Sequence, residues 1–262
     1  MRFEEKIAIV TGAGTGIGAA TARGFAADGG KVVLLGPEEG PLQEVAAETG
    51  GVAVVGDAAD AGDVGRAVAA AKELGGLDVV VACAGGEGFG KLLEVPHETF
   101  EAHMRINLTT AVVTTRETLP ALIERGGGSV VLVSSVAGLT AAGALVTYTT
   151  AKTALLGFVR SVAVDYGPEG VRVNAVLPGA VETDALAWYL SKQDPAVRDQ
   201  MVGKTLMRRN GVPTDIADAV LFLASPAASW ITGKLLEVDG AAGSDLIPRD
   251  IPDLEPTEEL PS

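Results

Sequence analysis

The chain has 262 residues, 47% of them hydrophobic, and a formal net charge of −14 at pH 7. This excess of acidic groups repels phosphate backbones and anionic lipid headgroups, so we expect neither a nucleic-acid nor a membrane partner. No apolar run approaches the roughly 20 residues of a membrane span, and the N-terminus lacks the apolar core of a signal peptide. Cys83 is the single cysteine, which excludes an internal disulfide. These features predict a cytoplasmic protein.

Along the chain, apolar runs rich in β-branched residues alternate with longer segments rich in alanine and charge. The runs predict strands near residues 6–10, 31–35, 52–55, 78–82, 129–134, 171–176 and 235–238. The periodic segments predict helices near residues 17–28, 41–49, 61–74, 99–124, 148–166 and 214–224. This alternation is typical of βαβ units. We therefore expect an α/β fold, a single doubly wound (Rossmann) parallel sheet of about seven strands with helices on both faces.

Two stretches depart from this rhythm. Residues 183–212 contain no obvious strand, and connections of this length are usually lids or binding loops. Residues 245–262 hold four prolines and six acidic residues against one arginine. We expect them to form an irregular acidic tail, with docking against a neighbouring subunit as the alternative. Residues 1–244 then form one domain that includes a substrate lid at 183–212.

A glycine-rich segment, Thr11-Gly12-Ala13-Gly14-Thr15-Gly16-Ile17-Gly18, follows the first predicted strand and opens the first predicted helix. Glycines at such a turn let the backbone approach a pyrophosphate. Free N–H groups and the positive end of the helix dipole then meet its charge. The strand–turn–helix context favours dinucleotide binding over a purely structural turn.

Tyr148 and Lys152 are four residues apart on a predicted helix, and Ser135 ends an apolar run thirteen residues before the tyrosine. Positions i and i+4 share a helix face, so the Lys152 ammonium would lie beside the Tyr148 phenol and lower its pKa toward a usable general acid/base. By themselves two residues at this spacing are more commonly a packed ring and a surface amine. Ser134 competes with Ser135 as the functional serine.

Together these motifs resemble the short-chain dehydrogenase/reductase family. The family's T-G-x-x-x-G-x-G motif matches Thr11, Gly12, Gly16 and Gly18, and the likeness extends from residue 6 to about residue 240. The other matching positions, in chain order, are Asp57, Ala84-Gly85, Asn107, Ser135, Tyr148, Lys152, Pro178-Gly179 and Thr183. One departure is visible: Ala82 and Cys83 replace the two asparagines of the family's N-N-A-G motif. We interpret Cys83 as a small buried residue rather than a redox thiol.

The resemblance implies a catalytic tetrad of Asn107, Ser135, Tyr148 and Lys152. Tyr148 would exchange the proton, Ser135 would hydrogen-bond the substrate oxygen, and Lys152 would hold the nicotinamide ribose. Asn107 would kink its helix and hold a water that links Lys152 to solvent. The residues expected to bind the cofactor are Gly12, Thr15, Gly16, Ile17, Gly18, Gly36, Asp57, Ala58, Ala84, Gly85, Asn107, Tyr148, Lys152, Pro178, Gly179, Val181 and Thr183.

The end of the second predicted strand bears on the choice between NAD and NADP. An acidic residue there binds the adenosine ribose and a basic one accommodates the 2′-phosphate, yet this chain has Gly36 and Pro37, followed by Glu38 and Glu39. Thr15 is neutral where some NADP-dependent relatives carry a basic residue. We favour NAD and leave NADP possible, because Lys31 or Arg66 could fold close.

The expected reaction is hydride transfer between a nicotinamide cofactor and a mainly apolar secondary alcohol or ketone. The lid side chains Leu186, Trp188, Tyr189, Met201 and Met207 would form an apolar wall, with the small residues 141–145 opposite. Five lid cations, Lys192, Arg198, Lys204, Arg208 and Arg209, keep an acidic or CoA-type substrate possible.

Three other functions remain open at this stage: a catalytically silent nucleotide-sensing protein, a 3-oxoacyl thioester reductase, and a sugar dehydratase or epimerase. We expect no metal, since His97 and His103 stand in no ligand-like spacing. The family resemblance further implies a homotetramer.

Overall fold

The computed structural model describes residues 1–192 and 194–242. Its centre is a seven-stranded parallel sheet in the order β3-β2-β1-β4-β5-β6-β7. The strands are β1 (Ile7–Thr11), β2 (Lys31–Gly36), β3 (Val52–Val55), β4 (Val79–Ala82), β5 (Gly128–Val133), β6 (Val171–Pro178) and β7 (Leu235–Val238). The expected doubly wound sheet and its strand count are confirmed, and the strand boundaries differ from the predicted ones by at most two residues.

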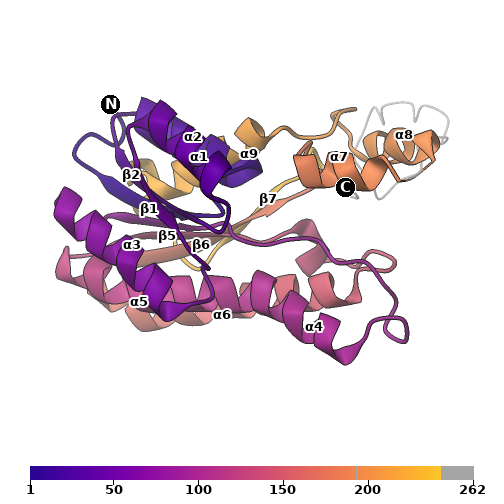
Figure 1. The fold of residues 1–262 in the computed structure, drawn as a ribbon, viewed down its shortest axis with the longest axis horizontal. Coiled ribbons are helices and arrows are strands. Elements are labelled where there is room, and N and C mark those ends of the chain that lie inside the picture. The colour runs from indigo at the N-terminus through magenta and orange to yellow at the C-terminus, as the bar shows by residue number, and fades with distance from the viewer. Residues whose placement is uncertain (193, 243–262) are drawn as a thin grey trace, which may run out of the picture.

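Helices cover both faces of the sheet (Figure 1). On one side lie α1 (Gly16–Ala27), α2 (Glu39–Thr49) and α9 (Pro213–Ala224), and on the other α3 (Ala61–Leu74), α5 (Thr110–Glu124) and α6 (Val146–Tyr166). Side chains of β1 alternate between the two faces of the sheet. Ile7 and Ile9 belong to the core under α3, α5 and α6. Ala8 and Val10 belong to the core under α1, α2 and α9. A strand buried on both faces explains its uninterrupted apolar run.

The segment predicted as one helix over residues 99–124 is interrupted. The structure has α4 (His97–Met104), one π-helical turn (Arg105–Thr109) and then α5. Within the turn, the Asn107 side-chain amide donates to the His103 carbonyl, the acceptor four residues earlier that the regular helical ladder would use. This local competition accounts for the wider turn, a break that periodicity alone does not reveal.

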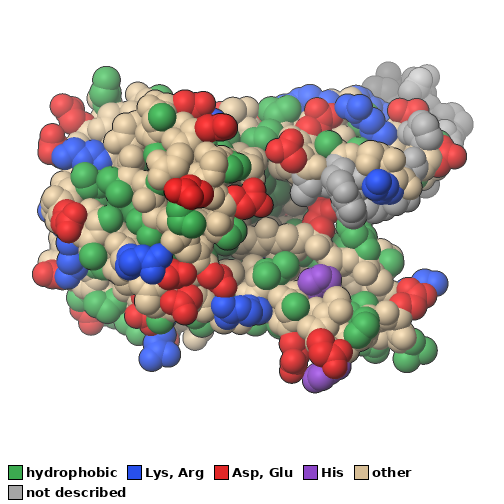
Figure 2. Space-filling model, viewed as in Figure 1, with side chains coloured by type: hydrophobic (Ala, Val, Ile, Leu, Met, Phe, Trp, Pro, Cys, Tyr) green, Lys and Arg blue, Asp and Glu red, His purple; other side chains and the backbone are tan. Residues whose placement is uncertain are grey.

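Sheet topology and the lid place a cleft at one end of the molecule. The chain order reverses between β1 and β4, the position where open parallel sheets bind ligands beyond the carboxyl ends of their strands. The lid carries two short helices, α7 (Asp184–Leu190) and α8 (Pro195–Lys204), which extend past the sheet in Figure 1. Figure 2 shows the surface hollowed between this arm and the part of the molecule that carries α4.

Within the described ranges, no helix combines the length and the apolar composition needed to cross a membrane. The acidic tail expected at 245–262 lies outside the described residues, as does residue 193 of the lid.

Candidate active site

A cleft of about 690 Å³ lies along the carboxyl ends of the strands. Of the residues predicted to bind the cofactor or to form the catalytic tetrad, all but Asn107 line it. The predicted residues in its wall are Gly12, Thr15, Gly16, Ile17, Gly18, Gly36, Asp57, Ala58, Ala84, Gly85, Ser135, Tyr148, Lys152, Pro178, Gly179, Val181 and Thr183. Positions scattered over most of the chain thus converge on one cavity.

The glycine-rich turn forms the narrow floor of this cleft. Gly12 has φ of 63°, a left-handed conformation that favours glycine. A Cβ at Gly18 would lie 2.1 Å from the Gly12 carbonyl oxygen, so only glycine fits there. Thr15 makes no side-chain cap at the start of α1, and the first turn holds no acidic residue. The open N–H groups and the helix dipole therefore suit an anion such as a pyrophosphate.

The Thr11 hydroxyl supports the end of β4 where the family's asparagines are missing. Its oxygen accepts hydrogen bonds from the backbone N–H groups of Cys83 and Ala84, each at 3.1 Å. Thr11 is almost fully buried, so these bonds are shielded from water. The departure at Ala82 and Cys83 leaves the backbone at this position satisfied.

At the opposite end of the cleft, Lys152 is held beneath Tyr148. The lysine is 4% exposed, which excludes the surface-amine alternative. Its Nζ donates to the Val133 carbonyl at 3.1 Å and lies 5.5 Å from the centre of the Tyr148 ring. Ser135 Oγ accepts from the Ala137 N–H at 3.1 Å, and its side chain hydrogen-bonds to Tyr148. By contrast, the Ser134 hydroxyl donates to the Lys152 carbonyl at 3.0 Å, a structural bond between β5 and α6.

The protonation of this group differs from expectation. Burial raises the pKa of Tyr148 to about 12, although the hydrogen bond from Ser135 opposes the rise and the charges of Glu87 and Cys83 add to it. Burial also lowers the pKa of Lys152 to about 8. We expected Lys152 to lower the phenol pKa. In the protein chain itself the phenol pKa is instead raised, chiefly because a buried charge loses its hydration.

Asn107 lies behind the cleft wall and is 1% exposed. Its Oδ1 accepts from the Gly86 N–H at 3.1 Å and its Nδ2 donates to the Gly86 carbonyl at 2.8 Å. A Cβ on Gly85 would come within 3.0 Å of Asn107 Oδ1 and 3.3 Å of Lys152 Nζ. The asparagine therefore fixes the loop that follows β4 and stands close to the lysine.

The end of the cleft away from Lys152 is formed by the segments that follow β2 and β3. We call it the adenosine-facing end, because the family resemblance implies that the adenosine of the cofactor binds there. Gly36, Pro37, Glu38 and Asp57 line it, and within the described wall of the cleft Lys152 is the single lysine and no arginine occurs. Asp57 pairs with Arg105 at 2.5 Å, a partner that the sequence motif did not predict.

Neither cation considered for this end of the cleft lines it. Lys31 is the first residue of β2, opposite Ile7 and five residues before Gly36. It therefore lies at the amino ends of the strands, away from the cleft. Arg66 is engaged by Asp63 and by the Val55 carbonyl. At the end of the cleft that would hold an adenosine ribose, Asp57 is neutralised by Arg105, and Glu38 leaves the lining acidic.

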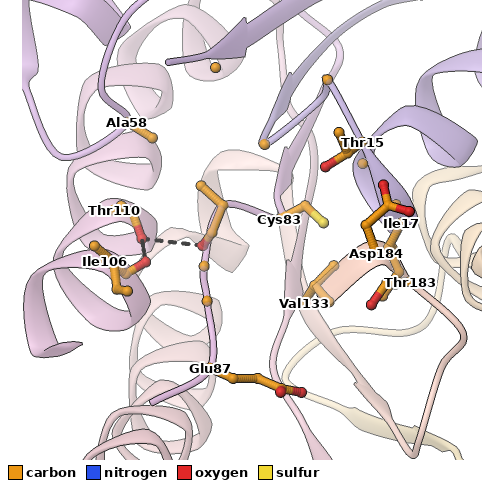
Figure 3. A pocket seen from close by; sticks show the side chains of 18 of the residues that line it. Thr15, Ile17, Ala58, Cys83, Glu87, Ile106, Thr110, Val133, Thr183 and Asp184 are labelled. Atoms are coloured by element: carbon orange, nitrogen blue, oxygen red, sulfur yellow. Dashed lines mark hydrogen bonds between the residues drawn. The ribbon is translucent and has the colours of Figure 1, made fainter. Parts of the chain in front are cut away.

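Several wall residues were not predicted from sequence. The clearest are Cys83, Glu87, Ile106, Thr110 and Asp184, all labelled in Figure 3. Thr110 donates to the Ile106 carbonyl at 2.9 Å and the Ala84 carbonyl at 3.4 Å, which ties α5 to the loop after β4. Each lies within three residues of a matched motif position, and that proximity is the signal that could have identified them.

The lid wall is only partly as expected. Leu186 and Met201 line the cleft. Met207 was predicted wrongly: it is 65% exposed and packs near Gly240, because the chain turns away from the cleft after α8. The side chains of Trp188 and Tyr189 are not among those the structure describes.

The small residues 141–145 do not line the cleft either; their chain pairs with the loop near Gly90. Of the lid cations, Arg198 binds Glu182 and Arg209 binds Asp215, and none of the five lines the cavity. Across residues 1–192 and 194–242, no group of three or more His, Cys, Asp or Glu side chains is arranged to hold a metal.

Comparison with known proteins agrees with this geometry. A family model described as enoyl-(acyl carrier protein) reductase matches residues 12–242. The chain is 39% identical to 2-(R)-hydroxypropyl-CoM dehydrogenase of Xanthobacter autotrophicus, over 90% of this chain and 98% of that protein. It is 36% identical to dehydrogenase/reductase SDR family member 4 of Oryctolagus cuniculus, over 92% and 95%.

Among solved structures, the fold resembles 7α-hydroxysteroid dehydrogenase in complex with NADH and 7-oxo glycochenodeoxycholic acid. The TM-score is 0.87 at 33% identity, covering 92% of this chain and 95% of that one. These dehydrogenases give no support to a nucleotide-sensing protein, a thioester reductase or a sugar dehydratase. The chain belongs to the short-chain dehydrogenase/reductase family of nicotinamide-dependent oxidoreductases.

Proposed function

We propose that this enzyme uses NAD to interconvert a mainly apolar secondary alcohol and its ketone, with Ser135, Tyr148 and Lys152 as catalytic residues. The observation that carries the proposal is the convergence of these three side chains at one end of a cleft whose floor suits a pyrophosphate. A bound nicotinamide supplies the hydride acceptor or donor.

The Tyr148 hydroxyl is the group that exchanges the proton at the substrate oxygen. It gives the proton during ketone reduction and takes it during alcohol oxidation. Ser135 hydrogen-bonds the same oxygen, where charge develops in the transition state. The Lys152 ammonium, held by Val133, orients the cofactor ribose and stabilises the phenolate. Asn107 fixes the loop beside Lys152 and completes the proton path.

Charge at the adenosine-facing end supports NAD over NADP. Glu38 and Asp57 line that end, and a doubly charged 2′-phosphate would find no lysine or arginine among its described lining residues. Like charges at close range repel, whereas a ribose hydroxyl can donate to a carboxylate. The solved neighbour was obtained with NADH.

Side chains on several elements support an apolar substrate body. Ile106, Val133, Leu186 and Met201 line the cleft, and such a surface favours apolar ligands of modest size. Arg198 and Arg209 of the lid are paired and none of the five lid cations lines the cleft, which argues against a large anionic substrate.

The proposal is tested by incubating the purified enzyme with NAD or NADP and a panel of alicyclic and aromatic secondary alcohols. Reduced nicotinamide is followed by its absorbance. We expect turnover with NAD and a higher kcat/KM for NAD than for NADP. Cofactor binding without turnover of any alcohol or ketone would contradict the assigned reaction, and a preference for NADP would contradict the assigned cofactor.

We also propose a cytoplasmic homotetramer. Val164 on α6, Phe222 on α9 and Trp230 before β7 are exposed apolar side chains, with Trp230 98% exposed. Exposed apolar residues of this size commonly mark subunit contacts. Light scattering at micromolar concentration is expected to give four times the chain mass, and a monomer would contradict the assembly.

A further inference from the structure

The reacting end of the cleft contains an acidic group that the family motifs do not explain. Glu87 lies in the loop between β4 and α4 and lines the cleft. In Figure 3, Asp184 lies with Thr15 and Ile17 at the glycine-rich turn, whereas Glu87 lies apart from them and extends its carboxylate into the cleft below Val133. Its charge acts on Tyr148, which places it at the reacting end.

The backbone on both sides of Glu87 is anchored. Asn107 binds the N–H and the carbonyl of Gly86, at 3.1 Å and 2.8 Å. On the other side, the Gly90 N–H donates to the Ala144 carbonyl at 2.7 Å. Glu87 therefore stands on a short stretch that is anchored at Gly86 and at Gly90. Its carboxylate is held at a defined position, which is what recognition of a small ligand requires.

Within the described part of the chain, no lysine, arginine or histidine forms an ion pair with Glu87, and no side chain or backbone group donates a hydrogen bond to it. The buried ammonium of the site, Lys152, is directed to the Val133 carbonyl. Partial burial raises the pKa of the Glu87 carboxyl, as expected for a charge that has lost part of its hydration. Apolar side chains such as Ile106 and Val133 share the cleft.

From this geometry we propose that Glu87 is a specificity-determining residue, which binds a hydroxyl or ammonium group beside the reacting carbon of the substrate and disfavours substrates with an anionic group there. The inference rests on the proposed function and deepens it. A donor on the substrate would replace the water that Glu87 loses when the substrate binds, since a charged acceptor without a donor is costly. A carboxylate in the same place would meet like charge in a partly desolvated site.

The test compares cyclohexanol with its vicinal diol, its vicinal amino alcohol and its vicinal hydroxy acid, as racemates, with NAD. Wild type is expected to prefer the diol and amino alcohol to the hydroxy acid in kcat/KM. Glu87→Gln is expected to reduce the ratio of amino alcohol to hydroxy acid about tenfold, the size of one charged hydrogen bond. Glu87→Lys is expected to invert the order. An unchanged ratio in both variants would overturn the inference.

Glu94→Gln is the matched control. Glu94 belongs to the same connection, pairs with Lys91 at the surface and does not line the cleft. Its substrate order is expected to equal that of wild type. If Glu94→Gln changed the ratio as much as Glu87→Gln, the effect would come from net charge and the inference would fail.

A second readout separates this inference from the proposed function. The four compounds are titrated into the enzyme–NADH complex and followed by nicotinamide fluorescence, which needs no turnover. The order of affinities should follow the same preference and depend on Glu87. Binding in that order without oxidation of cyclohexanol would contradict the reaction and support the recognition. Oxidation of cyclohexanol with no preference among the four would do the reverse.

Glu87 also affects the pH profile through Tyr148. Its negative charge, together with that of Cys83, raises the phenol pKa. Alcohol oxidation needs the phenolate, so its rate increases as pH rises. Removing the charge in Glu87→Gln is expected to move the rising limb to lower pH, whereas Glu94→Gln leaves it in place. A shift to higher pH would contradict the proximity of Glu87 to the reacting group.

Discussion

The two ends of the cleft are built differently. At the reacting end, Lys152 and Ser135 are buried and each is bonded to main-chain atoms. At the adenosine-facing end, Glu38 and Asp57 project from exposed loops. Under the proposed function, the chemistry would depend on groups fixed by packing, whereas the cofactor preference would depend on surface charges that can be exchanged at little cost in stability.

The largest effect is expected from Tyr148→Phe. Loss of the proton-transferring hydroxyl should lower kcat about 10³-fold, within the usual range for a general acid/base. The ring remains, so NADH affinity measured by fluorescence should stay within about twofold. Activity close to that of wild type would remove Tyr148 from its assigned role and weaken the contrast between the two ends.

Lys152→Met tests the burial of charge at the reacting end. The pKa of Lys152 is about 8 in the folded chain, below its ordinary 10.5. Between these values the unfolded chain binds a proton that the folded chain does not, so the lysine's contribution to the free energy of unfolding increases as pH rises from about 8 to 10.5. Below that window the buried ammonium is destabilising.

Urea unfolding of wild type and Lys152→Met at several pH values measures this contribution. The variant should be relatively most stable near neutral pH and lose that advantage toward the top of the window. Tyr148 and Cys83, whose pKa values are raised to about 12 and about 11, act in the opposite direction in both proteins. Lys192→Met, at an exposed lid position, controls for the loss of one positive charge. A difference between Lys152→Met and wild type that does not change with pH would contradict the lowered pKa.

Glu38→Arg tests the adenosine-facing end. An arginine there could pair with a 2′-phosphate, so kcat/KM for NADP relative to NAD should increase by about tenfold or more. The matched control is Glu39→Arg, since Glu39 is also exposed but does not line the cleft. Equal effects of the two substitutions would show a long-range charge effect rather than a local contact.

The smallest effect is expected from Arg105→Ala. Arg105 and Asp57 form an exposed ion pair, with side chains 51% and 49% exposed, and such pairs contribute less than about 1 kcal/mol. The free energy of unfolding, measured in urea, should change by no more than about 1 kcal/mol, and the KM for NAD by no more than about threefold. A tenfold change would mean that this end of the cleft is as tightly organised as the other.

Most of the fold could be predicted from the sequence, because hydrophobic runs and short motifs are local patterns. Apolar runs predicted the seven strands. The spacing of Ser135, Tyr148 and Lys152 left a structural alternative open, and the family resemblance was needed to predict these three residues as the reacting end. Helical periodicity did not predict the π-helical turn, although the family resemblance implied a kink at Asn107, because the turn depends on the side-chain bonds of Asn107 to Gly86 and His103. Those partners are set by tertiary contact.

The protonation states and the wall of the cleft were less predictable for the same reason. The raised pKa of Tyr148 results from burial that no spacing rule measures. The position of Met207 depends on the path of the chain after α8, and Glu87 stands in a loop with no periodic pattern. In each case the deciding contact joins segments that are distant in sequence.

The two hydrogen bonds of Asn107 to the Gly86 backbone fix the loop conformation independently of the side chain at position 87. Both polar groups of the Gly86 backbone are occupied, so the conformation just before position 87 does not depend on which side chain follows. A library of substitutions at that single position should therefore yield folded enzymes whose preferred ligands differ. The substrate preference could then change by substitution at position 87 alone, while Ser135, Tyr148 and Lys152 keep their positions.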